Sequence, residues 1–387
     1  MAKIDRVEIH EYTFIAENMG LDEGHRRGYC PGARTMLSNF AVVVSADDGS
    51  RGEYACMFGG KRAQLAQVLM LAPLLIGKDP AHREAIYNEC KRHTRQLGWL
   101  GVGMIDICLW DMTGKRLNTS VSDLLGGFRT RLPAYASTQN ADRHGGLTTK
   151  DDYAAFAERC WELGFRAFKI HGWPDGDARR EAENVLHIAS RVGDRMKLML
   201  DPACEMHTFA DALYLGRACD EAGFFWYEDP LMDGGVSHHA HRKLRQMIKT
   251  PLLITEQVRG LEPKADVIVA EATDFVRADP ELDLGITGTM KIAHLAEAFG
   301  LDVELHAVGP AHRHCIAAIR NTNFYELVAV TPKARNPVPP VFTCGYSDQL
   351  EDVGSDGCYP VPRGPGLGVS LDWAFIEKNR QKLHVYK

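Results

Sequence analysis

Hydrophobic and polar positions follow two different periods along this chain, one typical of strands and one typical of helices, and the order in which these periods occur changes near residue 130. The opening stretch IDRVEIHEYTF alternates as a half-buried strand does, and FAVVVSADDGSRGEYAC predicts two more strands joined at a DDG turn. From about Arg62 to Leu124 the apolar residues recur at helical spacing and stop at the glycines of LLGG, which suit a helix C-terminus. We therefore predict a small α+β domain over residues 1–128.

Beyond this boundary, short β-rich runs alternate with amphipathic helical stretches. Such alternation is typical of an α/β fold in which right-handed crossovers join parallel strands. Eight runs can be counted, the number that closes a (β/α) TIM-like barrel: LPAYAST, FRAFKIH, KLMLD, FFWYED, LLITEQ, DFVRAD, DVELHA and FYELVAV. We predict that the barrel spans residues 129–345 and that the Gly- and Pro-rich segment 346–387 returns to the first domain.

Composition and charge exclude several classes of protein. The 387 residues are 45% hydrophobic and 25% charged, and no apolar run approaches the roughly 20 residues that a membrane helix needs. The net charge is −6 and no basic stripe is present, which argues against a nucleic-acid partner. The ten cysteines form no C-x-x-C pair, and the N-terminus does not resemble a secretory signal. We expect a cytoplasmic protein that binds neither membrane nor nucleic acid.

Acidic residues close three successive predicted strands. Asp201 in LMLDP, Glu228 in WYEDP and Glu256 in ITEQV lie about one βα unit apart, so their carboxylates are expected side by side at the C-terminal face of the barrel, where active sites lie. Adjacent acids repel unless a cation holds them, and hard oxygen ligands favour Mg²⁺. The alternative is that each acid caps the helix that follows it.

Other strands carry groups suited to proton transfer. Lys169 and His171 alternate as K-I-H, so both side chains point to the same side of their strand. Their alternative role is structural, as a snorkelling lysine and a surface histidine. Asp279 and His306 end two later strands that are neighbours, and an Asp beside a His orients the imidazole and raises its basicity. His306 is therefore a candidate general base or acid.

Together these residues resemble the enolase superfamily, and within it the mandelate racemase subgroup. In that subgroup a K-x-K motif ends the second barrel strand, single acids ending the next three strands bind Mg²⁺, and an Asp and a His end the sixth and seventh. The resemblance implies the modified (β/α)7β form of the barrel, an α+β N-terminal capping domain, Mg²⁺ as cofactor and a homo-oligomer. It also places Glu326 where the family has an acid that hydrogen-bonds the substrate carboxylate or enolate.

The sequence departs from the family pattern at three positions. His171 stands where the second lysine of K-x-K is expected, Leu284 replaces a glycine, and Ala203 replaces a residue that is often polar. In this family, N-terminal loops fold over the barrel mouth and supply specificity. Candidate substrate-binding residues are His25, Arg26, Tyr29 and Trp173.

The resemblance and the residues together indicate a reaction. Removing a proton next to a carboxylate requires that the resulting enediolate be stabilised, which Mg²⁺ and preorganised hydrogen bonds can do. His171 and His306 would approach the substrate from opposite sides. We expect elimination of the β-hydroxyl from an aldonate or aldarate, giving a 2-keto-3-deoxy acid, because similar members of the subgroup are mostly acid-sugar dehydratases. A racemase or epimerase of a 2-hydroxy acid is the alternative. An inactive barrel is disfavoured because the triad of acids at the strand ends and the Asp279–His306 dyad are both intact.

Overall fold

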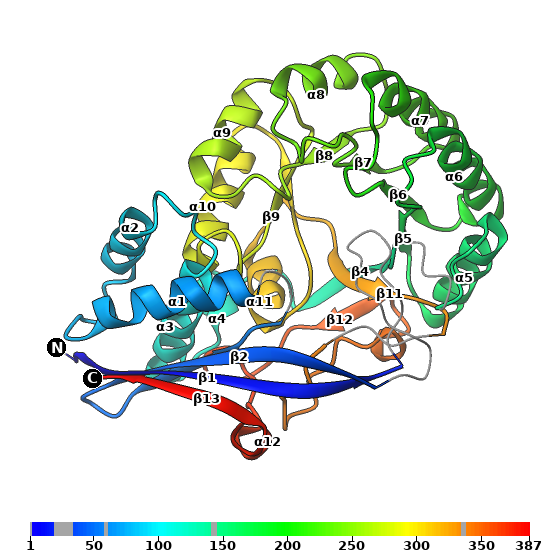
Figure 1. Cartoon of the computed structure of the whole chain (residues 1–387). Helices are drawn as coiled ribbons and strands as arrows, with labels where there is room; N and C mark the ends of the chain where they lie inside the picture. Colours follow the sequence, from blue (N-terminus) through cyan, green and yellow to red (C-terminus); the bar gives the residue numbers. More distant parts are fainter. Residues whose placement is uncertain (1, 19–33, 58–60, 141–144, 334–337) are drawn as a thin grey trace.

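The computed structural model describes residues 2–18, 34–57, 61–140, 145–333 and 338–387. Among these, no helix is long and apolar enough to cross a membrane. Figure 1 shows two parts, a curled sheet ringed by helices and a smaller sheet beside it.

The smaller part is an antiparallel sheet covered by helices on one face. Its strands pair in the order β13-β1-β2-β3, and both chain ends therefore lie in the same sheet (Figure 1). Helices α1 and α3 cover the sheet, and Val42 of β2 and Cys108 of α3 belong to one buried core. The elements are β1 (Ile4–Glu17), β2 (Arg34–Ala46), β3 (Arg51–Ala55), α1 (Lys61–Leu75), α2 (Arg83–His93), α3 (Val102–Leu117), α4 (Val121–Leu124) and β13 (Arg380–Tyr386).

The larger part contains all eight predicted parallel strands. They pair in the order β10-β9-β8-β7-β6-β5-β4-β11, and helices lie outside the curled sheet (Figure 1). The strands are β4 (Arg131–Thr138), β5 (Ala167–His171), β6 (Lys197–Asp201), β7 (Trp226–Glu228), β8 (Leu252–Ile254), β9 (Phe275–Ala278), β10 (Asp302–Leu305) and β11 (Tyr325–Val330). The helices are α5 (Lys150–Leu163), α6 (Ala178–Val192), α7 (Phe209–Ala222), α8 (His238–Arg245), α9 (Leu261–Val269), α10 (Gly285–Ala298) and α11 (Pro310–Ala318). The predicted TIM-like barrel with a capping domain is confirmed.

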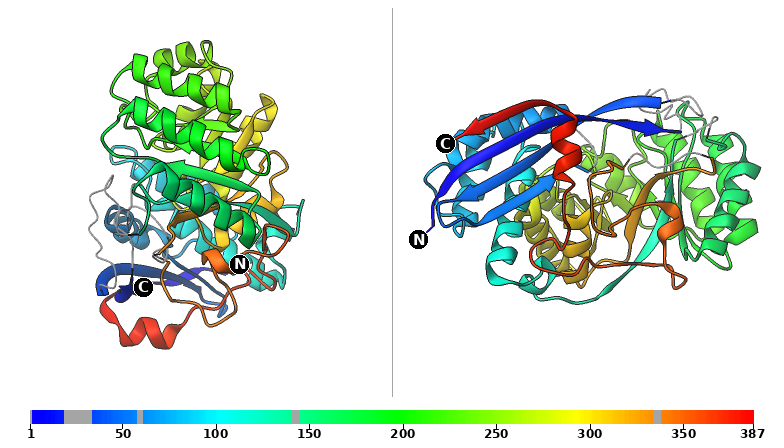
Figure 2. Two further views of the ribbon diagram at one scale, coloured as in Figure 1. Left: turned by 90° about the vertical axis from the view of Figure 1, so that its right-hand side faces the viewer. Right: turned by 90° about the horizontal axis from the view of Figure 1, so that it is seen from below.

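The C-terminal segment runs from the barrel back to the small sheet. It contains η1 (Leu350–Asp352), β12 (Cys358–Pro360), α12 (Trp373–Lys378) and β13. Strand β12 pairs antiparallel with β4, and β13 pairs antiparallel with β1, with Val7 opposite Tyr386. Figure 2 shows β13 and α12 at the outer side of the small sheet, away from the barrel helices.

A buried carboxylate joins the capping domain to the barrel. Asp106 of α3 accepts hydrogen bonds from the backbone N–H (2.9 Å) and the hydroxyl (2.7 Å) of Thr287, in the first turn of α10. Gly285 lies directly against this carboxylate, since a Cβ added there would come within 2.2 Å of Asp106 Oδ2. Because α10 follows β9, this contact holds the capping domain at the C-terminal end of the barrel strands.

Candidate active site

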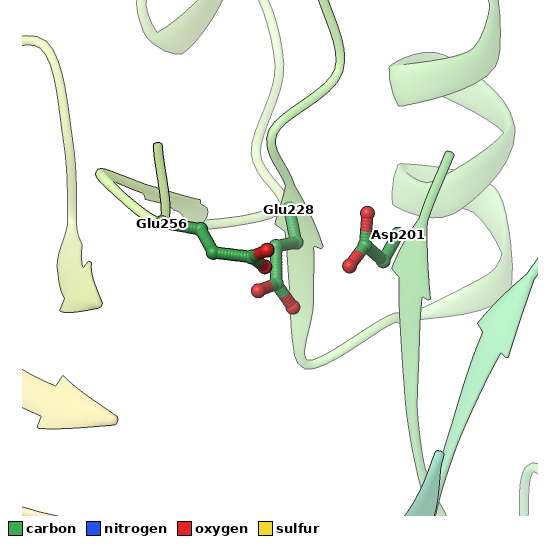
Figure 3. A group of neighbouring side chains, drawn as sticks. All are labelled: Asp201, Glu228 and Glu256. Atoms are coloured by element: carbon green, nitrogen blue, oxygen red, sulfur yellow. The ribbon is translucent and has the colours of Figure 1, made fainter. Parts of the chain in front are cut away.

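Three carboxylates meet at the C-terminal ends of adjacent strands. Asp201 ends β6, Glu228 ends β7, and Glu256 lies just beyond β8. One oxygen from each lies within 4.8 Å of the others, and Figure 3 shows the three side chains converging from their separate strands. Asp201 and Glu228 are buried and Glu256 is half-buried. Three hard oxygen donors so close together repel one another and fit a small divalent cation such as Mg²⁺.

Lys169 lies beneath this cluster and is buried. Its Nζ is 2.8 Å from Glu228, 3.0 Å from Glu326 and 3.3 Å from Asp201. Burial disfavours the charged ammonium, but the surrounding acids, Glu228 and Glu326 first, raise the pKa of Lys169 well above its ordinary value. The lysine is therefore a permanent positive charge at the floor of the site.

Arg277 is a second buried cation, and the sequence analysis missed it. It projects from β9, with Nε 2.7 Å from Glu228 and a terminal nitrogen 3.0 Å from Glu326. The same side chain donates a hydrogen bond to the hydroxyl of Tyr135 at 2.9 Å. Although burial opposes ionisation of Glu326, Arg277 and Lys169 lower the pKa of its carboxyl well below the ordinary value. A signal for Arg277 was present, because DFVRAD places a charge inside a buried strand.

His171 is held in one orientation by its contacts. Its Nδ1 lies 2.7 Å from the carbonyl oxygen of Thr138, and its backbone N–H donates to the hydroxyl of the same residue at 2.8 Å. A carbonyl can only accept, so Nδ1 carries the proton. The other nitrogen, Nε2, then faces Asp201 at 3.0 Å. This arrangement directs Nε2 of His171 at the carboxylate cluster.

His306 lies at the opposite end of the cluster and contacts Asp279, its predicted partner, and also Glu256. Its Nδ1 is 2.8 Å from Asp279 Oδ2, and its Nε2 is 3.6 Å from Glu256. Burial lowers the proton affinity of an imidazole, yet Glu256 and Asp279 outweigh it and raise the pKa of His306 to about 9. The Asp–His pair thus has the geometry of an orienting carboxylate and a proton-transfer group.

The structure connects most of the predicted site residues by direct contacts. Lys169 and His171 reach the acids from one side and His306 from the other, with Asp279 behind His306 and Glu326 beside Lys169. Trp173 is buried in the loop that follows β5, where its indole packs between Tyr153 (5.4 Å) and Arg180 (4.4 Å). The remaining candidates, His25, Arg26 and Tyr29, lie outside the described residues.

Comparison with known families agrees with this geometry. The family described as "Enolase C-terminal domain-like" matches residues 152–375, which contain every residue of the cluster described above. This chain belongs to the enolase superfamily. The family described as "Mandelate racemase / muconate lactonizing enzyme, N-terminal domain" matches residues 32–126 and places this enolase-superfamily member in the mandelate racemase subgroup.

Individual members of the superfamily are similar over most of their length. D-galactarolactone cycloisomerase of Agrobacterium fabrum is 29% identical over 352 residues, which cover 86% of this chain and 88% of the relative. L-talarate/galactarate dehydratase of Salmonella typhimurium is 26% identical over 299 residues, or 74% of this chain and 73% of the relative. The solved structure of D-glucarate dehydratase from Agrobacterium tumefaciens, complexed with magnesium, superposes with a TM-score of 0.86 at 27% identity and covers 98% of this chain and 99% of that one.

Proposed function

We propose that this protein is a Mg²⁺-dependent hydro-lyase that dehydrates an acid sugar, an aldonate or aldarate, to a 2-keto-3-deoxy acid. The observation that carries the proposal is the placement of two imidazoles on either side of one carboxylate cluster. His171 Nε2 lies 3.0 Å from Asp201, at one end, and His306 Nε2 lies 3.6 Å from Glu256, at the other. A substrate held over the cluster would have one proton-transfer group on each face.

The metal ligands in this proposal are Asp201, Glu228 and Glu256. Mg²⁺ bound there supplies a Lewis acid that polarises the substrate carboxylate and so acidifies the neighbouring C–H bond. Similar proteins support this assignment, since the D-glucarate dehydratase structure is a magnesium complex. Lys169 would bind the carboxylate of the substrate and stabilise the negative charge that develops on it, and Glu326, 3.0 Å away, would hold the lysine ammonium in place.

The two histidines complete the reaction. One accepts the proton from the carbon next to the carboxylate, and the other donates a proton to the β-hydroxyl, which leaves as water. The enol that remains loses its C2 hydroxyl proton and gains a proton on C3, which gives the 2-keto-3-deoxy acid with atoms and charges balanced. Asp279 keeps the His306 ring oriented, and the Thr138 carbonyl does the same for His171.

A second reaction uses the same groups. If the proton returns to the opposite face of the same carbon, the product is the epimer, and two opposed histidines permit this outcome. Relatives also differ in reaction, because one similar protein is a cycloisomerase and others are dehydratases. A racemase or epimerase of a 2-hydroxy acid is therefore the second candidate.

One experiment separates the two. The protein is incubated with Mg²⁺ in D₂O against a panel of aldonates and aldarates, and proton NMR follows each substrate. We expect a 2-keto-3-deoxy product from at least one acid sugar, and none when EDTA replaces Mg²⁺. Loss of the C2 proton signal without a keto product would instead favour the epimerase, and no change with any acid would refute both.

We also propose that the enzyme works as a homo-oligomer in the cytoplasm, on a small carboxylate substrate. The described cysteines are all free thiols, which suits a reducing compartment. Light scattering coupled to size-exclusion chromatography would test the assembly, and a mass of 43.0 kDa would refute it.

A further inference from the structure

Asp279 is held at both of its carboxylate oxygens. Oδ2 contacts His306 Nδ1 at 2.8 Å, whereas Oδ1 accepts the backbone N–H of Glu281 at 2.7 Å and lies 3.4 Å from Nε2 of His312. His312 belongs to the first turn of α11 and has no exposed surface. The dyad carboxylate therefore lies between two imidazoles, only one of which faces the cluster of acids.

Residues of the capping domain lie close to His312. Tyr54 and Met57 of that domain donate hydrogen bonds to Oε1 of Glu281, a buried residue that follows β9, from the Tyr54 hydroxyl (2.8 Å) and the Met57 backbone N–H (2.7 Å). Gly309, at φ 144°, fills the space between these groups. A Cβ added there would lie 3.0 Å from His312 Nδ1 and 3.1 Å from the Tyr54 hydroxyl, so the histidine and the capping strand meet around a residue without a side chain.

This arrangement restricts the carboxylate of Asp279. A carboxylate that binds only His306 can rotate and offer either oxygen, and the imidazole would then lose its fixed orientation. The Glu281 N–H holds Oδ1 at 2.7 Å, and His312 Nε2, 3.4 Å from the same oxygen, adds a side-chain contact that also opposes this rotation. The ring proton of His306 then stays on Nδ1, and Nε2 stays directed toward Glu256.

We propose that His312 is a positioning residue for the Asp279–His306 dyad, acting through the 3.4 Å contact between its Nε2 and Asp279 Oδ1. It does not touch the substrate. Only the expected loss of kcat rests on the proposed function, because the contact between His312 and Asp279 exists without a substrate.

Two substitutions at His312 and one at His314 test this role. His312→Leu removes the donor, and His312→Gln keeps an amide N–H that can reach Asp279. His314 is a matched control, because it lies two residues on in the same helix and is equally buried, but it bonds the Ser122 N–H and the Leu367 carbonyl. We expect His312→Leu to lower kcat by about 10- to 100-fold with KM nearly unchanged, and His312→Gln to restore most of the loss. His314→Leu should lower the melting temperature while leaving kcat per folded molecule unchanged.

A spectroscopic measurement needs no substrate. The Nδ1 proton of His306 should give a downfield proton NMR signal, identified by its absence from Asp279→Asn. We expect this signal to broaden or vanish in His312→Leu and to persist in His312→Gln and in His314→Leu. The proposal is overturned if the signal is unchanged in His312→Leu, or if His312→Gln loses it as completely as the leucine variant does. Should the wild-type protein turn over no acid sugar, the proposed function would fail while this test still decides the role of His312.

Discussion

The guanidinium of Arg277 and the carboxylate of Glu228 form a fully buried ion pair, with Nε and Oε1 2.7 Å apart. The same guanidinium also contacts Glu326 at 3.0 Å. One cation from β9 therefore fixes an acid of the proposed metal site on β7 and an acid of the proposed substrate site on β11. Neither acid has an exposed side chain, so their charges depend on Arg277 and Lys169 for compensation.

Replacing Arg277 should damage both stability and function. Arg277→Met leaves two buried carboxylates with Lys169 as their nearest cation. Removing one partner of a buried ion pair lowers the free energy of unfolding by about 3–5 kcal/mol. Removing a side chain that holds a metal ligand in place lowers metal affinity or activity by about 10- to 100-fold. Urea unfolding and Mg²⁺ titration calorimetry would measure these two losses.

An exposed arginine provides the control for this substitution. Arg320 pairs with Glu297 at 2.8 Å, and its side chain is 61% exposed. Arg320→Met should change the free energy of unfolding by no more than about 1 kcal/mol, since water screens such a pair. Equal losses in the two variants would contradict the compensating role given to Arg277.

Mg²⁺ should stabilise the protein through the three carboxylates. A ligand at 100 times its Kd adds about 2.7 kcal/mol to the free energy of unfolding of a protein that it binds only when folded. Glu256→Gln removes one of the three charges, so we expect the Mg²⁺-dependent rise in melting temperature to disappear. Glu262→Gln is the control, because this carboxylate is exposed and pairs with Lys91. The assignment fails if the two variants respond equally to Mg²⁺.

The two histidines should differ in which half of the reaction they perform. His171→Gln and His306→Gln are each expected to lower kcat for dehydration by about 10²- to 10⁴-fold, the usual range for a general acid or base. Exchange of the C2 proton with D₂O should survive in the variant that keeps the base and be lost in the other. Proton NMR reports both quantities. Exchange that persists in both variants would show that neither histidine is the base.

The sequence predicted the eight strands because each β-rich run is separated from the next by a helical stretch of distinct period. Asp201, Glu228 and Glu256 could be found because three carboxylates at the ends of successive apolar strands repel one another unless a cation holds them. The domain limits 1–128, 129–345 and 346–387 stay predictions, as do the roles of His25, Arg26 and Tyr29.

Other features depend on contacts that no local pattern specifies. Arg277 reaches β7 and β11 only because the sheet curls, and His312 reaches Asp279 only because α11 begins where it does. The backbone conformation of Leu284 could likewise not be predicted from the local sequence. This residue adopts φ 62° at the start of α10, a conformation that favours the glycine expected from the family pattern, and its side chain is fully buried there. Burial of the leucine side chain in the core offsets this strain.

His314 should make the fold sensitive to acid. Its Nδ1 accepts the backbone N–H of Ser122 at 3.1 Å, and its Nε2 donates to the Leu367 carbonyl at 3.0 Å, so both nitrogens are satisfied only in the neutral ring. Burial first, and Arg313 to a lesser degree, lower the pKa of His314 from 6.5 to about 4. The unfolded chain then binds more protons than the folded chain between these two values. Stability is complete above pH 6.5 and is lost as the pH falls toward 4, by about 3 kcal/mol in all.

Glutamine at this position would remove the acid sensitivity. The amide of His314→Gln can accept from Ser122 and donate to Leu367, but it does not titrate. Its free energy of unfolding should therefore fall less than that of the wild type between pH 6.5 and pH 4, by about 3 kcal/mol. Urea unfolding at several pH values gives the comparison directly. Parallel curves for the two proteins would mean that other groups cause the acid sensitivity, and that the Ser122 and Leu367 contacts do not hold the ring neutral.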